Sequence, residues 1–143
     1  MRFVCREFGL SDLPRRGLVP QEAPLEVLLL DIEAELSIRE EGQVVWSEEG
    51  FPVAEPAYHL AFWLRGPDAG REDFELDSMQ AEEGLIRIVE SEQGRRVGSI
   101  HPPDFWTSPV AWDVLVTEIG QFIRSVREGI AAMGIDPAFI PES

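Results

Sequence analysis

The chain has 143 residues and is 44% hydrophobic, which matches one domain with enough apolar side chains to form a core. It carries 27 acidic and 12 basic residues, a formal net charge of −15, so nucleic acids and anionic membranes are poor candidate partners. Cationic partners such as a basic protein surface are favoured, although the charge also has the simpler interpretation that it keeps the protein in solution.

Cysteine usage and the opening residues indicate the compartment. Cys5 is the only cysteine, so no internal disulfide can form, and we expect a structural thiol at this position. The opening residues lack the apolar run of a secretory signal, and the longest apolar run, residues 27–30, is too short to cross a bilayer. We therefore expect a cytoplasmic protein.

The first half of the chain contains two predicted strands and a helix. Residues 1–24 are expected to be irregular, with Arg2 to Phe8 as a candidate short strand. Residues 25–39 are predicted to form a strand, because acidic and apolar side chains alternate from Asp31 onward. A turn at 40–42 leads to a returning strand at 43–47, and residues 52–64 have the apolar spacing of a short helix.

The second half predicts three more strands and then the longest helix. Residues 73–79 alternate again, and residues 85–90 and 95–101 flank a hairpin turn at 91–94. The helix begins after Ser108, a candidate N-cap, and ends at Gly134. Its apolar face consists of residues at steps of three and four: Trp112, Leu115, Ile119, Phe122, Val126, Ile130 and Met133.

These elements follow the order β-β-α-β-β-β-α within a single domain at 1–143. Adjacent strands joined by short turns favour an antiparallel sheet. We therefore predict an α+β fold in which an antiparallel sheet of about five strands carries two helices packed on one face.

An acidic sheet face is the first candidate site. Its six carboxylates lie on one side of two predicted strands: Asp31, Glu33, Glu35, Asp73, Glu75 and Asp77. If these strands are close in the sheet, the carboxylates repel one another, and a cationic partner relieves the repulsion. The alternative is an outer face in water, interleaved with arginines such as Arg87 or Arg95.

A carboxylate beside an imidazole is the second candidate site. Glu55 and His59 are four residues apart on the first predicted helix, and His101 is the other histidine of the chain. This pairing is common in acid–base catalysis, whereas the alternative is a surface ion pair or a hydrogen-bonded core histidine. No cysteine or histidine pair has the spacing of a metal site, so we expect no metal and no cofactor.

The third candidate is the proline-stiffened loop at 101–107. An exposed Phe105 and Trp106 would form a preorganised anchor for a partner. The alternative is that both aromatic side chains fold back and close the end of the core.

Two stretches carry a resemblance to known proteins: Phe74-Glu75-Leu76-Asp77-Ser78-Met79, and Ser108-Pro109-Val110-Ala111-Trp112. They look like small acidic actinobacterial proteins with no assigned function. Single acidic domains of this type also resemble the immunity proteins of bacterial polymorphic toxin systems. The resemblance implies a protein that binds and blocks a toxin domain, and it assigns no site residue.

Two hypotheses of function follow. The first is a non-enzymatic interaction domain that binds a basic protein partner through the acidic sheet face, with neutralisation of a toxin domain as one case. The alternative is a small enzyme or ligand-binding domain with a pocket between sheet and helices, built on Glu55, His59 or His101. A homodimer formed through the sheet or an edge strand is the third option.

Overall fold

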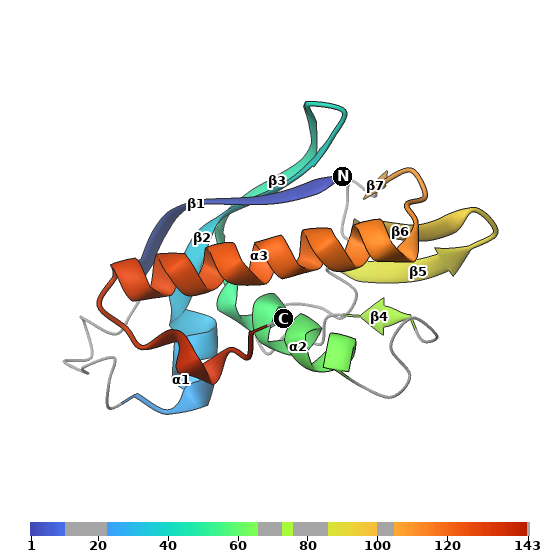
Figure 1. Ribbon diagram of the computed structural model, residues 1–143. Coiled ribbons are helices and arrows are strands. Elements are labelled where there is room, and N and C mark those ends of the chain that lie inside the picture. The colour runs from blue at the N-terminus through green and yellow to red at the C-terminus, as the bar shows by residue number, and fades with distance from the viewer. Residues whose placement is uncertain (11–22, 66–72, 76–85, 100–104, 143) are drawn as a thin grey trace.

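The computed structural model of the chain describes residues 1–10, 23–65, 73–75, 86–99 and 105–142 (Figure 1). In chain order, the described elements are β1 (Arg2–Leu10), α1 (Leu25–Asp31), β2 (Ile32–Glu40), β3 (Gln43–Phe51), α2 (Ala54–Arg65), β4 (Phe74–Glu75), β5 (Arg87–Ser91), β6 (Gly94–Ser99), β7 (Phe105–Trp106), α3 (Trp112–Ala132) and a short 3-10 helix at Pro137–Phe139. The α+β class predicted from the sequence is confirmed. No helix in these ranges has the length and apolar character needed to span a membrane.

The strands form two antiparallel sheets, so the predicted single sheet of about five strands is wrong. One sheet has the order β1-β2-β3 and the other has the order β4-β5-β6-β7. The candidate short strand at Arg2 to Phe8 is present as β1, which pairs with β2 from Arg2 opposite Arg39 to Leu10 opposite Ile32. β1 and β3 lie on the two edges of β2, and among the described strands none of the second sheet pairs with β1 or β3.

Helix α1 replaces the first part of a predicted strand. The backbone N–H of Leu28 donates to the carbonyl oxygen of Pro24 at 3.1 Å, and β2 begins only at Ile32. Leucine and glutamate favour a helix, and a short apolar run has no period that separates a helix from a buried strand. The alternation beyond α1 is confirmed, because the apolar residues of β2 are buried: Ile32, Ala34, Leu36 and Ile38.

Helices α2 and α3 lie where the apolar spacing predicts them. The buried face of α3 matches the predicted one closely: Leu115, Ile119, Phe122, Ile123, Val126 and Ile130. Gly134 has a φ of +81°, which suits a residue just beyond a helix. The predicted N-cap is wrong, because Ala111 holds that position and the N–H of Ser108 instead donates to Glu40 Oε1 at 2.6 Å.

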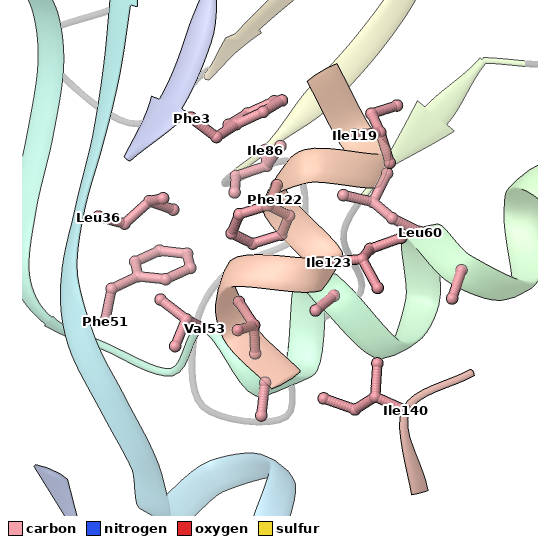
Figure 2. Packing of buried hydrophobic residues seen from close by; sticks show 14 of the residues in the cluster. Phe3, Leu36, Phe51, Val53, Leu60, Ile86, Ile119, Phe122, Ile123 and Ile140 are labelled. Carbon is pink, nitrogen blue, oxygen red and sulfur yellow. The ribbon is translucent and has the colours of Figure 1, made fainter. Parts of the chain in front are cut away.

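The core lies between the first sheet and the helices. The rings of Phe3 in β1 and Phe122 in α3 have centroids 5.3 Å apart, and Figure 2 shows Leu36 and Phe51 on the sheet side of Phe122. Helix α3 contacts both β1 and β6, so one long helix joins the two sheets (Figure 1). The β2–β3 hairpin extends beyond this helix, away from α1 and α2 (Figure 1).

Candidate functional site

The described carboxylates of the predicted acidic sheet face do not belong to one sheet. β2 carries Glu33 and Glu35, whereas Asp73 precedes β4 in the other sheet. Asp31 is the last residue of α1 and is only 5% exposed, because the chain is helical there and does not yet alternate as a strand. The side chain of Glu75 and the whole of Asp77 lie outside the described residues.

Glu33 and Glu35 are half-buried on the face of β2 opposite its core residues. The register of the first sheet places Arg6 of β1 opposite Glu35 and Gly9 opposite Glu33. Opposite charges at directly paired positions stabilise a sheet. The arginine beside Glu35 is thus Arg6, whereas the alternative interpretation named Arg87 or Arg95.

Asp73 has contacts that brace the second sheet. Its Oδ1 accepts a hydrogen bond from the backbone N–H of Glu90 at 3.0 Å and lies 3.8 Å from Arg95 Nη1. The Arg95 side chain is only 4% exposed, so the pair is buried on one side and open to water on the other. These contacts join the start of β4 to β5 and β6, and they give Asp73 a structural role.

Two of the three residues of the predicted acid–base group, Glu55 and His59, lie one turn apart on α2. Glu55 is fully buried in the first turn of α2, and His59 is half-buried one turn later with its ring 5.4 Å from that of Tyr58. Within the described ranges no hydrogen bond joins the side chains of Glu55 and His59, and His101 lies outside these ranges. The same ranges contain no group of three His, Cys, Asp or Glu residues that could hold a metal ion.

The aromatic pair of the third candidate lies on β7. Trp106 is half-buried and pairs with Gly98 of β6, and the side chain of Phe105 lies outside the described part of the structure. Next to them Thr107 is fully buried, and its Oγ1 accepts a hydrogen bond from the N–H of Val97 at 3.0 Å. Residues 105–107 are therefore fixed to β6, residues 101–104 lie outside the described ranges, and both the anchor and the closing role of the aromatic pair remain predictions.

Cys5 is half-buried on β1, where it pairs with the core residue Leu36 of β2. Burial raises the pKa of the Cys5 thiol from 9.0 to about 12, because a thiolate is poorly solvated there. A protonated, half-buried thiol is a weak nucleophile. Cys5 is thus a packing residue.

The β2–β3 hairpin has a two-residue turn and an exposed second strand. Glu40 pairs with Gln43, and the two turn residues between them, Glu41 and Gly42, have φ values of 52° and 80°. Positive φ at both central residues is the conformation that matches the twist of a two-residue hairpin. Among the described strands, β3 pairs only with β2, so its second edge is open.

Strand β3 exposes apolar and acidic side chains side by side. Val44 and Val45 are 52% and 37% exposed, and Glu48 and Glu49 are exposed further along the strand. The ring of Trp46 packs edge-on against the ring of Phe51, with the two centroids 5.7 Å apart. We call five of the exposed residues of this hairpin the hairpin surface: Glu41, Val44, Val45, Glu48 and Glu49.

Residues 10–132 match a family described as a domain of unknown function, DUF7878. The chain belongs to this family. No curated protein and no solved structure matches it. The family match includes the whole hairpin surface and all of α3, so both are part of the DUF7878 domain.

Sequence reasoning missed the hairpin surface of this DUF7878 chain. It treated residues 43–47 only as a returning strand, although Gln43-Val44-Val45-Trp46 lacks the strict alternation of a strand with one buried face. Two adjacent valines in a strand must point to opposite faces, unless a bulge intervenes, and at least one then meets solvent. The register indeed shifts between Ile38 and Arg39, opposite these valines.

Proposed function

We propose that this domain binds a basic protein partner through the hairpin surface, with an extended segment of the partner added along the open edge of β3. The supporting observation is a single strand that combines an open edge, two exposed valines and exposed carboxylates. Unpaired N–H and C=O groups at a sheet edge favour the addition of another strand. Valines exposed on such an edge favour aggregation unless a partner covers them.

Charge indicates which kind of partner fits. Glu41, Glu48 and Glu49 form no ion pair with any arginine in the described ranges, and the chain carries a net charge of −15. A second copy of the chain at this edge would bring like charges together, so a homodimer is disfavoured. A segment rich in lysine or arginine gains attraction and a faster encounter. A basic toxin domain is one such partner, and in that case the protein acts as an immunity protein.

The experiment begins with affinity capture from the native host and continues with the purified partner in isothermal titration calorimetry. One triple variant changes Glu41, Glu48 and Glu49 to Gln, and a second variant changes Val44 and Val45 to Thr, which keeps their shape. Each is expected to weaken binding at least about tenfold, and raising the salt concentration is expected to weaken the wild type.

A control triple variant changes Glu92, Glu128 and Asp136 to the neutral amides, because these exposed acids lie outside the hairpin. It alters the net charge equally and is expected to bind the partner within about twofold of the wild type. An equal loss in both triple variants would leave only a general charge effect and contradict the proposal. Light scattering that shows a dimer dissociated by the valine changes would also contradict it.

A further inference from the structure

A second feature of the molecule lies between α2 and α3, away from the β2–β3 hairpin. A groove of about 500 Å³ is lined by Leu64 and Arg65 of α2 and by Trp112, Val116, Gly120 and Arg124 of α3, among other residues. Sites for small molecules span roughly 300 to 1,000 Å³, so the groove has the right size for one. One turn before Leu64, Leu60 of α2 packs against α3 near Ile123 (Figure 2).

The wall formed by α3 has a regular arrangement. Trp112, Val116, Gly120 and Arg124 follow one another at steps of four residues, so they lie along one stripe of the helix. The stripe is about 18 Å long from first to last residue at the rise of an α-helix. Gly120 contributes no side chain in the middle, which leaves an elongated space with a tryptophan at one end and an arginine at the other.

The apolar end of the groove is held in place. The ring of Trp112 stands nearly perpendicular to that of Trp63, with the centroids 5.5 Å apart. The guanidinium carbon of Arg95 lies 5.4 Å from the Trp112 centroid, close enough for a cation–π contact. Trp112 is therefore oriented by its neighbours before any ligand binds. Less side-chain conformational entropy is then lost on binding.

The other end of the groove is basic, in a protein that is strongly acidic. Arg65 and Arg124 are both exposed, and no described residue that lines the groove is acidic. Arg65 Nη2 donates to the carbonyl oxygen of Glu142 at 2.6 Å. Arg124 has no ion pair with another residue in the described part of the chain, Glu128 included.

An adjoining hollow shows that this region already binds a carboxylate. It measures about 270 Å³ and is lined by Ile123, Arg124, Arg127 and Glu142. Arg127 Nη1 lies 2.6 Å from Glu142 Oε1, so one arginine of the pair on α3 holds a carboxylate from the chain itself. Arg124 lines both the groove and this hollow, so its guanidinium can bind a second carboxylate in the groove.

We propose that the α2–α3 groove binds an amphipathic carboxylate with an elongated apolar tail. The tail lies over Gly120 and Val116 towards Trp112, and the carboxylate meets Arg124, with Arg65 nearby. Arginine–carboxylate bonds are charge-assisted and directional, so the head group fixes the orientation of the ligand. This inference does not depend on the hairpin surface.

The test uses three probes that share one tail: decanoate, the neutral decanol and the cationic decyltrimethylammonium. Binding is followed through the NMR signals of the Trp112 indole and the backbone amides of α3. Decanoate is expected to bind at one site at least about tenfold more tightly than either other probe. The net charge of −15 alone would favour the cation, so the order of affinity separates a local site from a general charge effect.

Two variants and a control complete the test. Arg124→Gln is expected to weaken decanoate about tenfold, whereas the matched change Arg6→Gln, of an exposed arginine on β1, is expected to leave it unchanged. Gly120→Leu is expected to fill the groove and abolish binding while the helix remains folded. The proposal is overturned if decanoate fails to saturate a site, if decanol binds equally well, or if Arg124→Gln retains full affinity.

Discussion

Glu40, the last residue of β2, accepts a hydrogen bond of 2.6 Å from the backbone N–H of Ser108, which lies 68 residues later in the chain. Ser108 belongs to the segment between β7 and α3, so this bond ties the hairpin to the approach of the long helix. A carboxylate acceptor makes such a bond stronger than one between neutral groups. The hairpin surface is thereby held at its turn, and none of the described strands pairs with the second edge of β3.

Changing Glu40 to Ala is expected to lower the free energy of unfolding by about 1 kcal/mol, because a partly exposed hydrogen bond to a charged group is lost. The amide of Ser108 is expected to exchange with solvent faster, as followed by NMR. Glu92→Ala, at the turn of the other hairpin, serves as the control and should leave Ser108 unchanged. Unaltered exchange at Ser108 in Glu40→Ala would show that the bond does not persist in solution.

Gly129 of α3 permits a close approach of Phe8 in β1. A Cβ at position 129 would lie 2.6 Å from ring carbons of Phe8, although alanine would favour the helix by about 1 kcal/mol. Gly129→Ala is therefore expected to destabilise the protein, with overpacking costing about 1 to 3 kcal/mol. In a Phe8→Ala background the same change should become stabilising. Denaturant unfolding of the four proteins measures both effects, and the same sign in both backgrounds would be evidence against the contact.

Replacing either of two turn glycines with positive φ by alanine is expected to destabilise the protein, but by very different amounts. Gly94 has a φ of +135°, and a Cβ there would lie 2.5 Å from the carbonyl oxygen of Val110. That carbonyl is fixed, because Val110 and Arg95 exchange two backbone hydrogen bonds of 2.8 Å. Gly94→Ala should cost at least about 2 kcal/mol. Gly42→Ala, with open space around it, should cost about 1 kcal/mol from φ alone. Equal losses of unfolding free energy would refute the packing explanation.

The raised pKa of Cys5 predicts a dependence on pH. The folded thiol titrates at about 12 and the unfolded one near 9.0, so the unfolded state holds fewer protons between these values. Ionisation of Cys5 therefore leaves the free energy of unfolding unchanged below pH 9. Above pH 9 it lowers the free energy of unfolding, by at most about 1.4 kcal/mol per pH unit. Comparing the wild type with Cys5→Ala from pH 8 to pH 11 isolates this contribution. Parallel stability curves for the two proteins would mean that the thiol is not buried.

The spacing of apolar residues along the sequence was sufficient to predict the helices and strands in which that spacing is regular. The steps of three and four from Leu115 to Ile130 predicted α3 and its buried face, and the alternation from Ile32 to Ile38 predicted β2. The same logic failed over residues 25–31, where a short run of leucines suits a helix and a buried strand equally. The end of that helix buries Asp31, which removed one member of the predicted acidic face.

Long-range pairing accounts for the remaining errors. The first sheet contains β1, which joins β2 across more than twenty intervening residues, and no local signal in Arg2–Leu10 specifies that partner. The carboxylates of β2 belong to one sheet, and Asp73 lies at the start of the other. The exposed edge of β3 and the groove beside Arg124 likewise arise from tertiary packing, so the sequence alone did not indicate them.

Hydrogen–deuterium exchange of the complex with the captured basic partner tests the central proposal most directly. Strand addition should slow exchange of the amides of β3 that point to its open edge, within residues 43–49, and leave those of β6 unchanged. Protection confined to other elements, with β3 exchanging as fast in the complex as alone, would contradict binding at the hairpin surface.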